Sequence, residues 1–190
     1  MTELSIFNEV ISHQLKGMML HFDMANMYDF MGLKGFKRMH EYHGLHESAE
    51  MRGVCRYLIN HIGYLPNANG NDQVSIIPSS WLSATKFNVS ESDRKSKVKE
   101  LYVKWHDWET KTKSFYQSKF KELCDLGSVA SADKINELIC DVDNELKHVE
   151  REFIEYSSVG WDMVYIMDKQ CDIHDKYEKL TSDKIHVCMC

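Results

Sequence analysis

The sequence is poor in the residues that turn a chain sharply, with two prolines and nine glycines among 190 residues. An all-β chain of this length needs a turn after almost every short strand, so this shortage argues against a β-sandwich or a β-barrel. No stretch approaches the ~18 uninterrupted apolar residues of a membrane-spanning helix. We therefore expect a mainly helical chain without a membrane partner.

Signals for secretion and for a disulfide framework are also missing. Residues 1–10 contain two acidic side chains and no basic one, unlike the start of a secretory signal. The six cysteines lack paired CxxC spacing, which indicates reduced thiols and a cytoplasmic protein. The terminal Cys188-Met189-Cys190, with His186, offers donors for a soft metal ion, although we favour a frayed terminus.

Basic residues are fewer than acidic ones, 23 against 29, so the formal net charge is −6. Such a charge repels nucleic acid, so we expect no nucleic-acid partner. Lysines gather between Arg94 and Lys121, but acidic residues are mixed among them, which is typical of a solvated helix face. Hydrophobic content of 43% in 190 residues suits one globular core, so we predict a single domain over residues 1–190.

Apolar residues recur at helical spacing along most of the chain. We predict helices over residues 4–31, 36–62, 91–126, 132–156 and 161–180. Gly32 separates the first two helices, Gly63 and Pro66 end the second, and Gly127 ends the third. A short link between two long helices makes an antiparallel pair, so the first two helices should pack side by side.

Residues 67–90 show no helical period and begin with turn-forming residues at Asn67–Asp72. We expect a long crossover loop here, held against the helices by Trp81, Leu82 and Phe87. The order is two helices, a long crossover, two more helices and a short fifth helix. That order predicts an all-α fold, a four-helix bundle with one long crossover between its second and third helices.

Several short motifs occur in a meaningful order along this chain. They are Phe7-Asn8-Glu9 with Gln14-Leu15, then Gly32 to Phe36, Arg56-Tyr57-Leu58, Gly63 to Pro66, and Met163 to Lys169. In this order they resemble the bacterial non-haem ferritins, most strongly over residues 7–66. The resemblance implies a ferritin-like bundle that oxidises Fe(II) and stores iron in an oligomeric shell.

A sibling family shares part of this resemblance. Residues 29–36, followed by Met39-His40-Glu41, are also similar to Dps-type miniferritins, which build their iron site between subunits. The His-Trp pair of that family is missing here, and the long tail after Gly160 favours the ferritins proper.

The resemblance also implies a di-iron site. Ferritins build it from a Glu on the first helix, Glu-x-x-His on the second, a Glu on the third, and a Gln or Glu on the fourth. Facing helices supply the bridging oxygen ligands that a pair of hard metal ions needs. Here the first position falls on Gln14 and the second on Glu47 and Glu50. The third falls on Glu109 when counted from the helix start, or on Lys113 when counted from its end.

The fourth-helix position is ambiguous. Without a gap it falls on Leu146 and Val149, whereas a shift of one residue gives a Glu-x-x-His at Glu145 and His148. The apolar stripe places Leu146 and Val149 in the core, with Glu145 and His148 at its margin, about 100° away. We therefore expect an apolar fourth-helix face, in a bundle whose di-iron site is lost or rebuilt.

The second helix keeps a metal site plausible. His43, Glu47 and Glu50 share one face, which His46 flanks, and His13, Gln14 and His21 can face them from the first helix. Imidazole and carboxylate together suit iron, manganese or zinc, although a solvated polar face is the other interpretation. The candidate ligands are Gln14, His43, His46, Glu47, Glu50, Glu109, Glu145 and His148.

Two functions follow from these patterns. The first is an iron-binding, ferritin-like protein, which is a ferroxidase if its di-metal site is intact. The alternative is a non-catalytic ferritin-fold protein that acts through protein binding or assembly without metal. We expect a homo-oligomer, because the aromatic side chains are more than one bundle easily buries. Those side chains are Phe7, Trp81, Phe87, Tyr102 and Trp161.

Overall fold

The computed structural model describes residues 2–66, 76–77 and 89–188, and their side chains as far as residue 180. The helices are α1 (Glu3–Phe30), α2 (Lys34–Tyr57) with a π-helical turn η1 (Leu58–Ile62), α3 (Glu91–Asp125), α4 (Val129–Ser158) and α5 (Met163–Cys188). All secondary structure in the described residues is helical. The all-α prediction is therefore confirmed.

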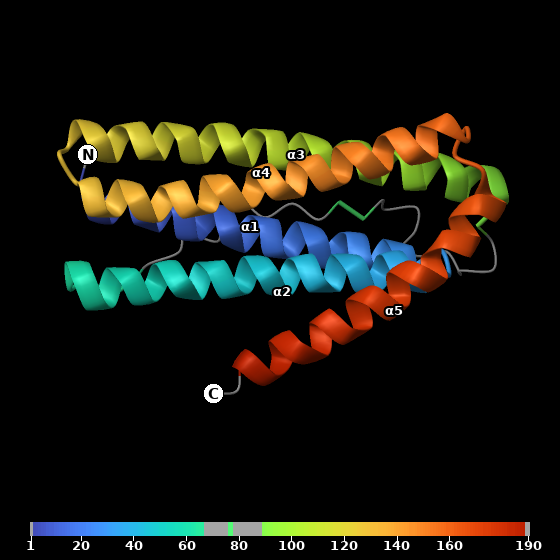
Figure 1. The fold of residues 1–190 in the computed structure, drawn as a ribbon, viewed down its shortest axis with the longest axis horizontal. Coiled ribbons are helices and arrows are strands. Elements are labelled where there is room, and N and C mark those ends of the chain that lie inside the picture. Colours follow the sequence, from blue (N-terminus) through green and yellow to red (C-terminus); the bar gives the residue numbers. More distant parts are fainter. Residues whose placement is uncertain (1, 67–75, 78–88, 189–190) are drawn as a thin grey trace.

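The first four helices lie alongside one another as a bundle, and α5 crosses it obliquely next to α2 (Figure 1). Helices α1 and α2 form one antiparallel pair, and α3 and α4 form the other. Helix α3 begins at the same end of the bundle as α2 does, so the chain between them has to return along the bundle's length (Figure 1). This arrangement confirms the predicted long crossover.

Helix ends follow local chemistry. Thr2 caps α1 and forms a reciprocal capping box with Ser5, and the Ser90 side chain caps α3. Gly63 ends η1 in a left-handed conformation with φ of 79°, which favours glycine. Helix α5 continues to Cys188 rather than ending near residue 180, because the chain has no glycine or proline after Gly160 to stop it.

Two apolar clusters fill the two ends of the bundle. One gathers around Tyr28, Phe36 and Tyr156 near α5, and the other around Ile6 and Ile135 near the start of α1. The section between these clusters is polar and holds the candidate site.

The aromatic argument for a homo-oligomer fails at three of its five residues. Phe7, Tyr102 and Trp161 are buried inside one bundle, where they pack against other aromatic rings. Trp81 and Phe87, like Leu82 and the terminal Cys188-Met189-Cys190 side chains, lie outside the described side chains. Phe7, Tyr102 and Trp161 therefore offer no exposed aromatic surface for assembly.

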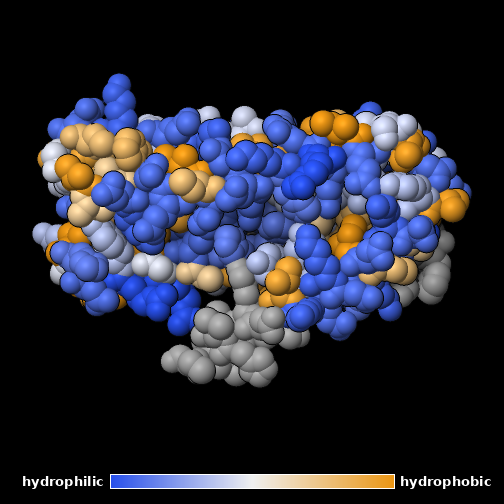
Figure 2. All heavy atoms as spheres, viewed as in Figure 1, coloured by the Kyte–Doolittle hydropathy of each residue, from blue (hydrophilic) through white to orange (hydrophobic). Residues whose placement is uncertain are grey.

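The face of the molecule in Figure 2 is mainly hydrophilic, with hydrophobic side chains in small separate patches. Exposed apolar side chains include Leu65 after η1, Val129 and Ile154 near opposite ends of α4, and Val164 on α5. None of the helices in the described part of the chain is long and apolar enough to cross a bilayer.

A candidate metal centre inside the bundle

The middle of the bundle buries an unusual number of ionisable side chains. They are His21 on α1, His40, His43 and Glu47 on α2, and Glu109 on α3. A buried polar group costs free energy unless it is hydrogen-bonded, paired or bound to a ligand. The partners of these groups therefore show what the section is built to hold.

Three helices bring potential metal ligands together at one level. His21, Glu109 and Glu145 each offer one ligand atom, and these atoms all lie within 4.8 Å of one another. The His21 Nε2 atom lies 3.6 Å from Glu109 Oε1, which also accepts a hydrogen bond from Trp105 Nε1 at 3.1 Å. The spacing suits ligand atoms that surround a single ion at bond lengths of about 2.0–2.2 Å.

His43 joins this group through Glu145. Its Nδ1 atom donates to Glu145 Oε1 at 3.1 Å, which leaves the lone pair of a neutral imidazole on Nε2. That Nε2 atom is buried and has no hydrogen-bond partner among the described residues. We call His21, His43, Glu109 and Glu145 the histidine level.

A second histidine supports His21. Its Nδ1 atom lies 3.0 Å from Nδ1 of His40, so one ring must donate and the other accept. If His21 donates, its Nε2 atom presents a lone pair toward Glu109. Metal ligands of this type usually have a second partner that fixes their tautomer, and His40 is placed to do so.

Burial keeps His21, His40 and His148 neutral near neutral pH. Burial lowers the pKa of His21 to about 4, and it lowers the pKa of His40 well below its usual value. Burial likewise lowers the pKa of His148 to about 4. Neutral imidazole is the form that binds metal ions, so these rings need not lose a proton near neutral pH.

The carboxyl groups divide into two kinds. Burial raises the pKa of both Glu47 and Glu109 well above the usual range, and neighbouring carboxylates add to the effect. Burial also opposes ionisation of Glu145, but charge and hydrogen bonds from His43 and His46 outweigh it and lower its pKa well below normal. One carboxylate is therefore charged while others keep protons that a cation can displace.

The seam between α2 and α4 leads from this level toward solvent. His46 Nδ1 lies 3.4 Å from Glu145 Oε1 and 3.7 Å from Glu50 Oε1, and His46 is partly exposed. Burial, nearby Glu145 and a hydrogen bond to Asp141 raise the pKa of Glu50 to about 8, against the opposing charge of His46. His46 and Glu50 thus flank the centre from its more exposed side.

A second polar group lies farther toward the start of α1. Gln14, Glu47 and Tyr116 come from α1, α2 and α3, and their side chains are buried. We call these three residues the phenol level. Gln14 Oε1 and Nε2, Glu47 Oε2 and the Tyr116 hydroxyl have no hydrogen-bond partner in the described part of the chain.

Two residues considered from the sequence, His148 and Lys113, lie outside the histidine level. His148 accepts or donates one hydrogen bond with the Tyr177 hydroxyl at 3.0 Å and lies 3.5 Å from Glu152, outside the histidine level. Lys113 pairs with Asp143 at 2.6 Å and is partly exposed. Glu109, not Lys113, is therefore the α3 residue that faces the interior.

The expectation of an apolar fourth-helix face is wrong at Glu145. Val149 is buried and Leu146 packs partly against the core, as the stripe predicted. Glu145 nevertheless reaches inward from the margin to His43. A glutamate side chain is long enough to cover the distance from a helix margin to the interior, so its Cα direction alone does not decide where the carboxylate lies.

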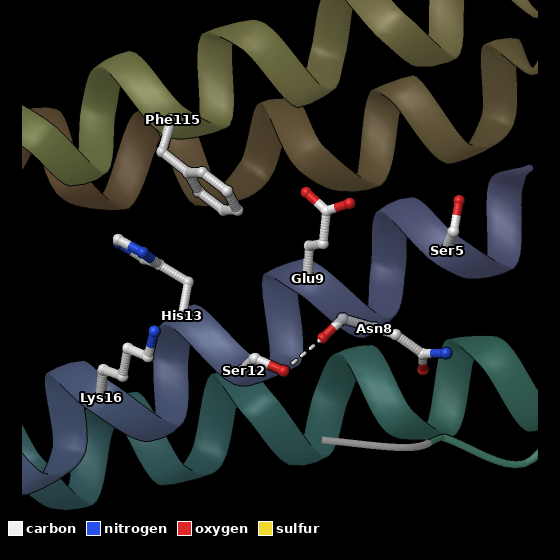
Figure 3. A pocket seen from close by; sticks show the side chains of 7 residues that line it. All are labelled: Ser5, Asn8, Glu9, Ser12, His13, Lys16 and Phe115. Carbon is white, nitrogen blue, oxygen red and sulfur yellow. Dashed lines mark hydrogen bonds between the residues drawn. The ribbon is translucent and has the colours of Figure 1, made fainter. Parts of the chain in front are cut away.

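His13 does not face the centre. It lines a surface hollow of about 450 Å³ between α1 and α3, where Figure 3 shows it beside Phe115. Its ring stacks on Trp108 at 4.6 Å and on Phe115 at 4.4 Å, and its Nε2 atom lies 2.8 Å from Thr112 Oγ1. His13 therefore packs the outer face of α1, while Gln14 points inside.

Sequence reasoning missed Trp105 and Tyr116 as polar partners. Trp105 is apolar apart from its ring N–H, and nothing in the helical spacing indicates that this N–H meets Glu109. Tyr116 lies seven residues after Glu109, two helical turns along the same face, and that spacing was the available signal.

No family model and no curated protein sequence matches this chain. In structure it is similar to an open pore ferritin from the hyperthermophilic archaeon Archaeoglobus fulgidus, with 12% identity, 90% of this chain and 95% of that chain covered, and a TM-score of 0.74. An engineered closed form of the Archaeoglobus fulgidus ferritin gives 12% identity, 90% and 94% coverage, and a TM-score of 0.75. A humanized archaeal ferritin gives 12% identity, the same coverage and a TM-score of 0.74.

These similarities show that the chain has the ferritin-like fold, as the sequence resemblance implied. At 12% identity they establish the fold alone, so the chemistry of the interior has to be argued from this chain's own residues.

Proposed function

We propose that this protein binds iron at the histidine level inside a ferritin-like bundle. The observation that carries the proposal is the convergence of His21, Glu109 and Glu145 from three helices onto one buried point. Imidazole nitrogen and carboxylate oxygen in this ratio suit Fe(II), and they also suit manganese or zinc.

The donor set fits a metal ion better than it fits a purely structural core. His21 Nε2 and His43 Nε2 are buried and lack hydrogen-bond partners among the described residues. Each unsatisfied buried group costs about 1–3 kcal/mol. A cation bound between His21 Nε2 and the Glu109 and Glu145 carboxylates would give the His21 nitrogen a partner, while His43 holds Glu145 in position.

Oxidation and storage extend this proposal. Fe(II) entering along the α2–α4 seam would meet His46 and Glu50 before it reaches Glu145. We infer that iron oxidised in the interior is retained by an oligomeric assembly of the chain in the cytoplasm. The support is the ferritin-like fold, because the solved relatives are described as ferritins.

Calorimetry during an anaerobic titration with Fe(II) tests the metal site. Glu109→Gln keeps the shape of the protonated side chain, so the apo bundle should retain its unfolding temperature. The affinity should fall by roughly 100-fold, at the upper end of losses seen when ligand-supporting residues are removed. Glu150→Gln is the matched control, since Glu150 is an exposed residue of α4 that lies 3.5 Å from His106.

Equal Fe(II) affinity in the wild type and in Glu109→Gln would show that iron does not bind at the histidine level. Oxygen uptake after adding Fe(II), and molar mass by light scattering, test oxidation and assembly separately. If the protein is a monomer that binds Fe(II), the metal site is supported and storage in an oligomeric shell is contradicted.

Assembly without metal remains the second candidate function. It is favoured by Glu50, which occupies the place that the ferritin resemblance gives to a histidine. Glu50 is partnered by protein groups instead, namely His46 and Asp141. A wild-type protein that binds no divalent metal but forms a defined oligomer would establish this alternative.

A further inference from the structure

A row of large aromatic side chains connects the histidine level with the first turn of α5. Trp105 on α3 is fully buried, and its ring centroid lies 5.0 Å from that of His43. The Tyr102 ring lies 5.9 Å from Trp105, and the Tyr156 ring on α4 lies 5.4 Å from Tyr102. The Tyr165 ring on α5 lies 6.3 Å from Tyr156. We call Trp105, Tyr102, Tyr156 and Tyr165 the aromatic row.

The aromatic row runs from the interior to the surface. Trp105, Tyr102 and Tyr156 are buried, whereas Tyr165 is partly exposed. Among the described residues, Tyr102 is the one tyrosine or tryptophan whose ring contacts Trp105, because the other rings around Trp105 are histidines. An electron that passes from ring to ring between Trp105 and the surface therefore has to cross Tyr102.

The partners of its phenol groups distinguish this row from ordinary core packing, in which aromatic centroids also lie about 4.5–7 Å apart. The Tyr102 hydroxyl donates to Glu152 Oε2 at 2.7 Å, and the Tyr165 hydroxyl donates to Glu155 Oε1 at 2.5 Å. A phenol becomes a strong acid when its ring loses an electron. A carboxylate within hydrogen-bond distance can take the proton at that moment, as a general base does.

The two carboxylates suit this exchange in different ways. Burial raises the pKa of Glu152, against the hydrogen bond from Tyr102, which makes this buried carboxylate a stronger base. Hydrogen bonds from Tyr165 and Lys169 lower the pKa of Glu155, which keeps it charged near neutral pH. Each proton stays next to the phenol that released it, so oxidation creates no isolated positive charge in the interior, where such a charge is costly.

We propose that the aromatic row carries single electrons from the histidine level to a soluble one-electron acceptor at the α5 surface. The proposal rests on the proposed function, which supplies the electron from bound Fe(II). Electron transfer between rings weakens steeply with distance, so a row of rings in contact is faster than one long step through aliphatic side chains. Such a row allows the buried ion to be oxidised by an acceptor that is too large to enter the bundle.

The transfer leaves the aromatic row unchanged. The acceptor takes one electron from Tyr165, and the phenol proton passes to Glu155. Tyr165 then regains an electron from Tyr102 across the Tyr156 ring. As it does so its own proton returns, and the Tyr102 proton passes to Glu152. An electron from bound Fe(II) restores Tyr102 and its proton, so one electron has left the ion and joined the acceptor.

The apo protein tests the row without any metal. A ruthenium(III) polypyridyl complex, generated in solution by a light flash, oxidises the protein from outside, and electron paramagnetic resonance detects tyrosyl radicals. We expect a long-lived tyrosyl signal in the wild type, because Tyr102 is buried away from solvent. Tyr102→Phe should lose this signal. Tyr165→Phe should lower its yield although Tyr102 is intact, since the exposed end of the row is then missing.

Tyr28→Phe is the matched control. Tyr28 is also fully buried, but its ring stacks on Phe36 and His40 rather than on a member of the aromatic row. This variant loses one buried phenol, as Tyr102→Phe does, and should keep the long-lived tyrosyl signal of the wild type.

Ferricyanide tests the protein loaded with Fe(II) in the absence of oxygen. This complex anion carries several charges, so the apolar interior excludes it, and the loss of its colour reports each electron that it receives. At equal Fe(II) content, reduction of ferricyanide should be several-fold slower in Tyr102→Phe than in the wild type or in Tyr28→Phe.

Equal tyrosyl signals and equal ferricyanide rates in Tyr102→Phe and Tyr28→Phe would overturn the proposal. Should Tyr102→Phe fold poorly, an unchanged radical yield in Tyr165→Phe would overturn it instead. A wild type that binds no Fe(II), but whose tyrosyl signal depends on Tyr102, would keep the aromatic row and reject the metal site. Fe(II) binding without a long-lived tyrosyl signal would keep the metal site and reject the row.

Discussion

The two polar levels of the bundle differ in how their groups are partnered. At the histidine level His43 donates to Glu145, and Trp105 donates to Glu109, so the ligands are held in position by the protein. At the phenol level Gln14, Glu47 and Tyr116 face one another without hydrogen bonds among the described residues. The first level holds its carboxylates in position and leaves two imidazole nitrogens unpartnered, whereas in the second level all three side chains have unpartnered polar atoms.

This difference predicts how each level responds to mutation. Removing a ligand from a preorganised site should lower metal affinity and change the apo stability little. Removing an unpartnered polar group should stabilise the apo protein, because a buried group without a partner costs free energy that an apolar replacement does not. Three variants, at Glu145, Gly17 and Gln14, separate the two behaviours.

The largest effect is expected at Glu145, which contacts both His43 and His46. Glu145→Gln removes the one interior carboxylate whose pKa lies below its usual value. Fe(II) affinity should fall by roughly 100-fold, as for loss of any ligand and its support. Calorimetric titration measures this loss, and a decrease of less than a few-fold would show that Glu145 is not a ligand.

Gly17→Ala should disturb the phenol level without replacing any of its three residues. The new methyl group displaces the buried Glu47 carboxyl, so the unfolding temperature of the apo protein should fall. Gly53→Ala is the control, since a Cβ there meets nothing within 4 Å. It should stabilise α2 by about 1 kcal/mol. Equal unfolding temperatures in the two variants would contradict the placement of Glu47.

Gln14→Leu should stabilise the apo protein by about 1 kcal/mol, because it removes two unpartnered polar atoms from the interior. Chemical denaturation without metal measures the change. A destabilised apo variant would mean that the amide is satisfied, for example by buried water.

The smallest effect is a pH dependence of apo stability. Glu50 has a pKa of 4.5 in the unfolded chain and about 8 in the folded chain, so its contribution to stability is complete below pH 4.5 and is lost as pH rises to about 8. His21 acts oppositely, since its contribution is present above pH 6.5 and lost as pH falls to about 4.

Between pH 6.5 and about 8 the carboxyl effect therefore acts alone, and the unfolding temperature of the apo protein should decrease. Glu50→Gln, which stays neutral, should show a shallower decrease, with Glu47 and Glu109 supplying the remainder. An identical slope in Glu50→Gln and the wild type would show that Glu50 ionises normally.

Much of the fold could be predicted because its signals are local. The apolar spacing, the caps and the glycines at 32, 63 and 127 define helix ends, and their order defines the crossover. The start of α4 was placed three residues late, at 132 rather than 129, because Ser128 forms no side-chain cap there.

The candidate site was predicted only in part. Spacing alone brought His43 and Glu47 to one face, but whether Glu145 or Leu146 faces inward depends on side-chain reach. The pairing of His21 with Glu109, like the position of Tyr116 beside Gln14, depends on the axial register of α1 against α3. Periodicity gives the face of each helix and says nothing of that register.

The most direct test of the central claim is to locate the metal. Crystals grown with Co(II), a stand-in for Fe(II), would give an anomalous diffraction peak wherever an ion binds. We predict a peak inside the bundle between His21 Nε2, Glu109 and Glu145. Peaks confined to the protein surface, with the interior side chains unmoved, would contradict the account.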